Sequence, residues 1–483
     1  MGTEINKLPA YQRLANKIEQ QILSGKIPHG QKLGSIRQLA NTEKVSINTI
    51  RAALDKLAQS GIIHSIARIG FVVNYQQEAQ DLQLFEQFNA DSRLAESSQR
   101  WLHTMVTGNR AVNPFFHMAV PTDTKIFKSF QRQYRQVIKQ QISTEMGNAA
   151  GSSALRAIIS EHLALRQCHV AASEIQITNG CQHALEHALR VLCKPGDTVA
   201  IPVPAFPGYF ALLGVLGLKV LEIPMSPQGP DVEILQQAMA NQSISTLLIQ
   251  PNCHNPTGIT LTDQYKQQIA QWAQQYQIPV IEDDISAQLN FIGQPASLIR
   301  NYDTQGWCLI ISSISKVIGD SERLGWCCAG RFQQQYKTQF AVSQINNSYF
   351  LQQALTRYYQ GSLYQSQLRN WRTEVKAATT AVTLRLKQAL PEQLQITPSS
   401  GGYSLWIKLP DQITAAQLHQ LVDKEKVDFL TGDLFSLAPR FKQFIRLIIM
   451  PPLSKKTLGG IDHLIEVIGY ALSNQKPFKS RSF

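Results

Sequence analysis

Several short motifs that could bind a charged ligand follow apolar runs in the middle of the chain. Gly180-Cys181-Gln182 opens an apolar helical stretch, and free N–H groups at such a helix start can bind a phosphate, with an ordinary helix start as the alternative. Asn255-Pro256-Thr257-Gly258 follows a second run, although a plain turn would use the same residues. Glu282-Asp283-Asp284 follows a third, and acids at the end of a buried strand are unusual without a partner. Ser313-Ile314-Ser315-Lys316 follows a fourth, and Arg323 comes seven residues later.

The elements that would position these motifs are strands and helices in alternation from about residue 113 onward. Asp263 to Tyr276 has a helical pattern, and the short apolar strand candidates are Val199–Pro202, Val220–Ile223, Thr246–Gln250, Val280–Glu282 and Cys308–Ser312. This alternation predicts an α/β domain with a mainly parallel sheet. Ligands of such sheets bind at the carboxyl ends of the strands, where the motifs lie.

In this order along the chain, the motifs resemble those of the fold-type-I pyridoxal phosphate enzymes, the aspartate aminotransferase-like class. The resemblance covers roughly residues 113 to 475 and includes two C-terminal segments, Gly401–Trp406 and Phe444–Leu447, that are similar to the family's small domain. It implies a large α/β domain with a smaller C-terminal α+β subdomain, and pyridoxal 5'-phosphate as the cofactor.

The resemblance also implies a role for each site residue. Lys316 would hold the cofactor aldehyde as an imine, and Asp283 would keep the ring nitrogen protonated. Asn255 would donate to the ring oxygen, and Phe206 would stack on the ring. Arg446 would clamp the carboxylate of a substrate or effector, with a surface arginine as the alternative. The cofactor phosphate would be bound by Gly180, Cys181, Gln182, Ser313, Ser315 and Arg323.

Three positions depart from the family pattern. Ser286 stands where relatives usually have a tyrosine shortly after the aspartate, Met146 where many have an aromatic residue, and Ser321 where they often have glycine. The missing tyrosine would normally donate to the ring oxygen. Cofactor binding is compatible with these changes, whereas efficient transamination is less so.

The first 75 residues form a separate basic module. They contain ten Lys and Arg and four acids, so their net charge is +6, half of the net charge of +12 of the whole chain. Helical stripes over Tyr11–Ser24 and Ile47–Ser60 flank a short helix that Ser35 can cap. Ser46 is a second N-cap candidate, and two strand candidates end the module, so the pattern predicts a winged helix-turn-helix. A basic module on a near-neutral body suggests a polyanionic partner.

The module resembles the GntR-type winged helix, which implies binding to double-stranded DNA. The motifs that carry the resemblance contain Ser35, Arg37, Ser46, Asn48, Thr49 and Arg51. Ser46, Asn48 and Thr49 would lie near base edges, and Arg37 and Arg51 would contact phosphates. Gly34 replaces the usual proline and Ile47 a frequent arginine. A degenerate module that only packs or dimerises is the alternative.

Composition excludes several other classes of protein. With 43% hydrophobic and 17% charged residues, the chain is neither a disordered chain, a collagen-like repeat nor a coiled-coil rod. No apolar run approaches the roughly 20 residues of a membrane helix, and the first residues lack a signal-peptide pattern. Seven cysteines without paired C-x-x-C spacing favour a reducing cytoplasm over a zinc site or a disulfide framework.

The fusion of a basic module (1–75), a linker (76–112) and an aminotransferase-like domain (113–483) resembles the MocR-like branch of the GntR regulators. The resemblance implies a homodimeric transcriptional regulator that senses an amine or amino acid through imine exchange at Lys316. A working aminotransferase with a vestigial DNA module is the alternative, and a scaffold regulator without the cofactor is a third interpretation.

Overall fold

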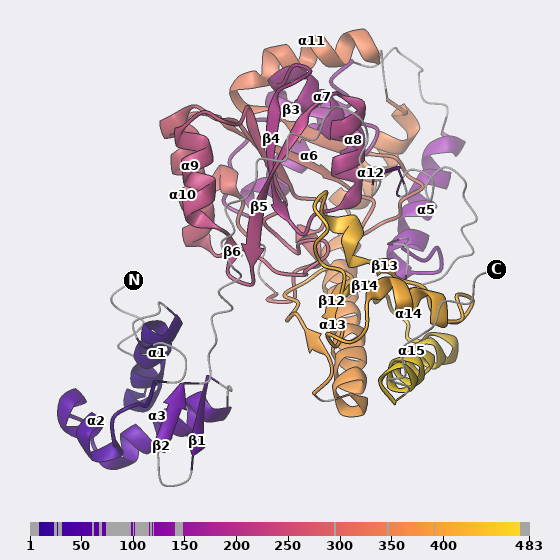
Figure 1. Ribbon diagram of the computed structural model, residues 1–483. Coiled ribbons are helices and arrows are strands. Elements are labelled where there is room, and N and C mark those ends of the chain that lie inside the picture. The colour runs from indigo at the N-terminus through magenta and orange to yellow at the C-terminus, as the bar shows by residue number, and fades with distance from the viewer. Residues whose placement is uncertain are drawn as a thin grey trace. The chain divides into compact units, whose positions relative to one another are not determined.

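A computed structural model of the chain (Figure 1) describes residues 9–23, 27, 31–59, 62–66, 70–73, 98–99, 101, 115, 118, 120–140, 148–293, 296–344, 347–390 and 392–473. The chain divides into two compact units, Met1–Glu86 and Gln87–Phe483. Of the predicted linker, only Ser98, Gln99 and Trp101 are described. Residues 67–69, in the loop between the two predicted wing strands, and Met146 lie outside the described residues.

The N-terminal unit has the predicted order of three helices and a hairpin. Its elements are α1 (Ala10–Leu23), α2 (Ile36–Glu43), α3 (Ile47–Gln59), β1 (Ile63–Ile66) and β2 (Gly70–Val73), with β1 antiparallel to β2. Ser35 caps α2 in a capping box with Gln38, which confirms the predicted N-cap. Ile50 and Leu54 of α3 are fully buried in the core of this unit. The segment before α2 also pairs with β2, because Leu33 N–H donates to Phe71 O at 2.9 Å, a contact that the sequence did not predict.

The second unit is built on an eight-stranded sheet. In spatial order its strands are β3 (Ile175–Thr178), β10 (Gly325–Cys328), β9 (Cys308–Ser313), β8 (Val280–Asp283), β7 (Thr246–Ile249), β4 (Thr198–Val203), β5 (Lys219–Ser226) and β6 (Gly229–Pro230). Neighbours from β9 to β5 are parallel, whereas β10 is antiparallel to both of its neighbours and β6 is antiparallel to β5. The prediction of a mainly parallel sheet is confirmed.

Helices cover both faces of this sheet, as the alternation along β4 shows. Val199 and Ile201 pack in a cluster with α7 and α8, whereas Ala200 between them packs in a cluster with α9 and α10. The helices of this part of the chain are α5 (Lys125–Lys139), α6 (Ser153–Ala164), α7 (Cys181–Leu192), α8 (Pro207–Val215), α9 (Val232–Ala240), α10 (Asp263–Tyr276), α11 (Gln333–Ser343) and α12 (Tyr349–Gln360). Short 3₁₀ turns lie at Ala172–Glu174, Ala287–Leu289, Ile299–Tyr302, Gly330–Phe332 and Gly432–Phe435.

The C-terminal part, coloured orange to yellow in Figure 1, forms the predicted smaller α+β subdomain. Its antiparallel sheet has the order β11 (Gln395–Ile396), β12 (Ser404–Lys408), β14 (Phe444–Ile448) and β13 (Leu430–Thr431). Its helices are α13 (Leu363–Ala389), α14 (Ala415–Leu421) and α15 (Lys455–Ser473). No helix in the described part of the chain is long and apolar enough to span a bilayer.

The parallel pairing of β8 with β9 brings two of the predicted motifs together. Asp283, the last residue of β8, pairs with Ile311 of β9, and β9 ends two residues later at Ser313. The carboxylate of β8 and the Ser313–Lys316 motif therefore lie at the same edge of the sheet, as the sequence predicted.

Candidate functional site

Asp283 is a buried carboxylate that three donors orient. Its Oδ2 accepts a hydrogen bond from Tyr209 Oη at 2.5 Å, and its Oδ1 accepts from Ile285 N–H at 2.9 Å and faces Cys181 Sγ at 3.6 Å. Burial raises the pKa of Asp283, and the hydrogen bonds from Tyr209, Ile285 and Cys181 oppose this rise. Since all three groups donate, the arrangement favours the charged carboxylate that a protonated ring nitrogen needs.

Tyr209 was missed by the sequence reasoning. It lies in the first turn of α8, three residues after Phe206, and its ring meets that of Phe206 edge to face at 5.5 Å. The three-residue spacing from the predicted stacking residue was the signal that could have found it. Phe206 is half-buried, and its ring packs on Tyr209, whose hydroxyl donates to Asp283.

Lys316 lies in the loop after β9 and is half-buried. Burial, together with the positive charges of Arg446 and Arg323, lowers the pKa of its amine to about 8, although Asp320 and Asp283 oppose the shift. More of this amine is neutral near pH 7 than for an ordinary lysine, and a neutral amine is the nucleophile that attacks an aldehyde.

The predicted phosphate residues gather at the start of α7 and the end of β9. Gly180 is the N-cap of α7 with φ +86° and no side-chain cap, so the first N–H groups of the helix have no capping side chain. A Cβ at Gly180 would lie 2.6 Å from Arg323 Nη2, so only glycine allows this guanidinium to lie against the helix start. Ser313 Oγ donates to Ser315 Oγ at 2.9 Å, and both side chains are buried, whereas Gln182 is exposed.

Arg446 and Asn255 meet between the two sheets of the second unit. Arg446 Nη1 lies 3.5 Å from Asn255 Oδ1, and Ser404 Oγ lies 3.4 Å from the same oxygen. Arg446 belongs to β14 and is only 3% exposed, so the surface-arginine alternative is wrong. Burial lowers its pKa to about 9, and a buried guanidinium is stabilised by a negatively charged ligand.

These residues fit pyridoxal phosphate on the donor chemistry that the structure shows. A buried carboxylate, an amine with a lowered pKa, and an arginine against an open helix start lie around the edge of one sheet. Of the departures from the family pattern, Ser286 is buried and Ser321 is exposed, with its Oγ donating to Glu322 Oε2 at 2.7 Å.

The acids on either side of Asp283 have partners within the protein. Asp284 forms a bidentate ion pair with Arg166, with 2.8 Å between Nη2 and Oδ1. Glu282 accepts from Ile299 N–H at 2.9 Å, and burial raises its pKa to about 8. Two of the three acids therefore bind groups in other parts of the fold, and no local pattern in the sequence pointed to Arg166.

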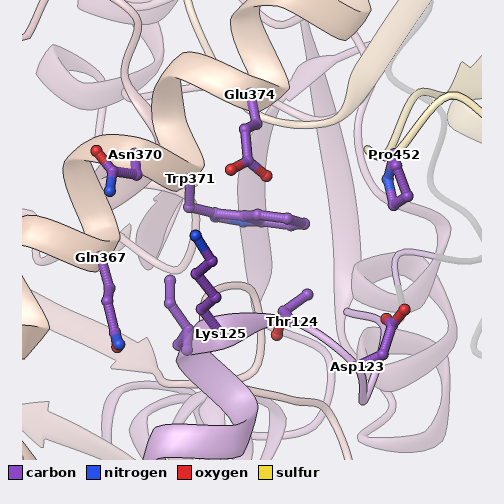
Figure 2. A pocket seen from close by; sticks show the side chains of 9 residues that line it. Asp123, Thr124, Lys125, Gln367, Asn370, Trp371, Glu374 and Pro452 are labelled. Carbon is purple, nitrogen blue, oxygen red and sulfur yellow. The ribbon is translucent and has the colours of Figure 1, made fainter.

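A surface pocket of about 210 Å³ is lined by residues at the start of α5 and on α13 (Figure 2). Trp371 forms part of its wall, and its Nε1–H donates to Tyr403 Oη at 2.8 Å, which in turn donates to the carbonyl of Lys316 at 2.6 Å. Helix α5 forms another wall of the pocket and also packs on the loop that carries Lys316. A Cβ at Gly319 of that loop would lie 3.3 Å from Phe127 of α5. The pocket is lined by Asp123, Thr124, Lys125, Ile126, Gln367, Asn370, Trp371, Glu374 and Pro452.

The predicted DNA-binding residues lie on α2 and at the start of α3. Arg37, Asn48 and Arg51 are exposed, and no hydrogen bond or ion pair of their side chains with another described residue is found. Ser46 and Thr49 bond each other, with 2.8 Å between their hydroxyl oxygens. This face therefore presents two guanidinium groups and one carboxamide to solvent.

Replacing Tyr209 with phenylalanine is expected to weaken pyridoxal phosphate binding about tenfold, since a hydrogen bond to a charged group contributes roughly 1.5–3 kcal/mol. In the wild type, the hydrogen bond from Tyr209 lowers the pKa of Asp283, so its loss should raise that pKa. The carboxyl of the variant should then become neutral at a higher pH, and the affinity of the variant for the cofactor should fall further as the pH drops. Titration of the apoprotein with the cofactor from pH 6 to 9 measures this. Tyr265→Phe, which removes a hydroxyl bonded to Pro230 O, is the control. Equal affinities of wild type and Tyr209→Phe would contradict the role of Tyr209.

Comparison with known families matches both units. Residues 117–468 match the family described as aminotransferase class I and II, and residues 10–73 match the bacterial regulatory proteins of the gntR family. The first of these matches covers more than half of the chain.

Relatives and solved structures agree with these matches. The uncharacterized HTH-type transcriptional regulator YjiR of Escherichia coli is 28% identical over 96% of this chain and 99% of its own. The HTH-type transcriptional regulator NorG of Staphylococcus aureus is 25% identical over 84% of this chain and 92% of its own. Kynurenine aminotransferase of Pyrococcus horikoshii shares the fold, with a TM-score of 0.69 and 23% identity over 77% of this chain and 94% of that chain. The chain therefore belongs to the aminotransferase class I and II family and, with its N-terminal gntR-type domain, has the architecture of the MocR-like regulators.

Proposed function

We propose that this protein is a DNA-binding transcriptional regulator whose aminotransferase-like unit binds pyridoxal phosphate and senses an amino acid or other amine at Lys316. The observation that carries the proposal is the presence, in one chain, of an exposed helix-turn-helix face and a site with an amine, a carboxylate and a buried arginine. In this proposal the chain acts as a homodimer. It works in the cytoplasm, a reducing compartment that is compatible with seven cysteines that form no disulfide.

The proposed effector is defined by the residues that would bind it. Pyridoxal phosphate, when bound, supplies an aldehyde that condenses with primary amines. Lys316, with a pKa of about 8, is an amine that a competing primary amine can displace. Arg446 is a buried guanidinium suited to a carboxylate. An effector with both an amine and a carboxylate would engage both groups, and it can shift a conformational equilibrium only through its different affinities for the two states.

The test is DNA binding by the full-length protein loaded with pyridoxal phosphate. A duplex selected from a random library should bind at least tenfold more tightly than its scrambled sequence at fixed salt. An amino acid from a panel of twenty should change that affinity for the wild type and leave Lys316→Ala unchanged. Equal binding to selected and scrambled duplexes would overturn the proposed DNA function.

A working aminotransferase is the second candidate, because Lys316, Asp283, Arg323 and Arg446 are all present. Ser286 weighs against it, since a serine is too short to replace a tyrosyl hydroxyl at the same place. Keto-acid formation from an amino-acid pair, lost in Lys316→Ala, would establish the activity, and a broad panel without product would exclude it.

Removing either exposed arginine of the DNA face is expected to reduce the salt dependence of binding. Each phosphate contact contributes about −0.9 to the slope of log K against log salt, so Arg37→Ala and Arg51→Ala should each make the slope less steep by about one per half-site. The loss should be similar for selected and scrambled duplexes, because phosphate contacts carry no sequence information. Lys128→Ala, which removes one exposed charge from α5, should leave the slope unchanged. A slope unchanged in both arginine variants would contradict the assigned DNA face.

A further inference from the structure

The first residue of α3 is an exposed isoleucine. Ile47 is 47% exposed to solvent. Among the described residues of the N-terminal unit, no other large apolar residue is exposed. Its neighbour in the next turn, Ile50, is fully buried in the core of that unit. The exposure of Ile47 therefore has no explanation in the packing of the module itself.

The hydroxyl groups beside Ile47 are already engaged. Ser46 Oγ accepts a hydrogen bond from Thr49 N–H at 3.1 Å and lies 2.8 Å from Thr49 Oγ1. These contacts cap α3, and a hydroxyl that leaves a cap costs the helix about 1 kcal/mol. Thr49 is also half-buried. The resemblance to the GntR-type winged helix implied that Ser46, Asn48 and Thr49 lie near base edges. The cap leaves Asn48 and Ile47 as the side chains of this first turn for which no polar partner is found among the described residues.

The chemistry of the DNA major groove offers one partner for an exposed apolar side chain. Every polar base edge there is a hydrogen-bond donor or acceptor, which isoleucine cannot pair, whereas the C5-methyl group of thymine is apolar. A carboxamide such as that of Asn48 can pair with the N6 and N7 atoms of adenine.

We propose that Ile47 determines sequence specificity by contacting a thymine methyl group in each half-site of the operator, next to a base pair that Asn48 reads. This inference rests on the proposed DNA-binding function and specifies the bases that its recognition helix selects.

The test separates the methyl group from the rest of the base. The full-length protein first selects a duplex from a random library, and each thymine of that duplex is then replaced singly by deoxyuridine, which lacks only the methyl group. One position per half-site should lose about fourfold in affinity, the effect of removing one buried methyl-sized group. Replacing that thymine in both half-sites should cost about sixteenfold.

Variants of Ile47 assign the effect to this side chain. Ile47→Ala should bind the thymine and deoxyuridine duplexes equally, and Ile47→Val should keep most of the difference. Ile138→Ala, which truncates an exposed isoleucine on α5, is the matched control and should retain the full difference. Because Ile47 is exposed, its truncation should leave the thermal unfolding midpoint of the protein unchanged.

The outcomes distinguish this inference from the function on which it rests. If no duplex is enriched, the proposed DNA binding fails. If a duplex is enriched but deoxyuridine is tolerated everywhere, or weakens wild type and Ile47→Ala equally, the role of Ile47 is wrong while DNA binding stands. If Ile47→Ala changes the oligomeric state but still binds the thymine duplex more tightly than the deoxyuridine duplex, Ile47 instead belongs to a contact between copies of the chain.

Discussion

Replacing Lys316 with alanine is expected to abolish covalent capture of pyridoxal phosphate by the protein. The amine of Lys316 is held at the edge of the sheet beside Asp283, and its pKa of about 8 leaves it reactive near neutral pH. Lys266, another buried lysine of this unit, donates to Asn252 Oδ1 at 2.8 Å and to Ser297 O at 3.0 Å, so it is committed to the fold. We therefore expect a single reactive lysine in this unit.

Borohydride reduction followed by intact mass spectrometry measures this directly. Wild-type protein incubated with the cofactor should gain the mass of one reduced pyridoxal phosphate and lose its visible absorption band. Lys316→Ala should gain no such mass. Lys337→Ala, which removes an amine that donates to Ser173 O, should behave as wild type. A stoichiometric adduct on Lys316→Ala would show that another lysine carries the cofactor and would refute the site.

Replacing Arg166 with methionine is expected to destabilise the second unit by about 3–5 kcal/mol, the usual effect of breaking a buried ion pair. The side chains of Arg166 and Asp284 are 11% and 4% exposed, so the variant leaves a carboxylate buried without its cation. Asp284 also lies beside Asp283, whose pKa its negative charge raises. Loss of the guanidinium should therefore weaken cofactor binding as well as the fold.

Urea unfolding, followed by a probe in the second unit, measures the change in stability. Arg385→Ala, which breaks the exposed pair with Asp462, should shift the midpoint little. The double variant Arg166→Met with Asp284→Leu should regain part of the lost stability, because no buried charge is then left without a partner. A single variant as stable as wild type would mean that the buried pair contributes nothing to folding.

Local signals in the sequence predicted the parts of this structure that depend on neighbouring residues. The cap of α2 at Ser35 is fixed by residues three positions apart, and short apolar runs predicted strands ending at Glu282 and Ser312, one residue before the ends in the structure. Such features need no knowledge of the tertiary fold, because the groups involved meet within one turn or one strand.

The contacts that complete the site depend on the fold and could not be predicted in the same way. Tyr209 meets Asp283 across 74 residues of chain, and Arg166 meets Asp284 across 118. Arg446 becomes buried only because the small sheet brings it to Asn255, 191 residues earlier. No periodicity or turn signal encodes such distances. The resemblance to a family suggested Arg446, but its burial and lowered pKa came from the structure.

The hydrogen bond from Tyr403 to the carbonyl of Lys316 ties the lysine loop to the residue just before β12. That bond and the packing of Phe127 near Gly319 restrain the main chain at Lys316 and three residues after it. Displacing the amine therefore frees a side chain without moving the backbone that carries it. Under the proposed function, the small sheet would contact the ligand through Arg446 of β14, because its guanidinium suits a carboxylate. We expect a simple amine to engage Lys316 alone and an amino acid to contact Arg446 of β14 as well, so the amino acid should change DNA binding more strongly than the simple amine.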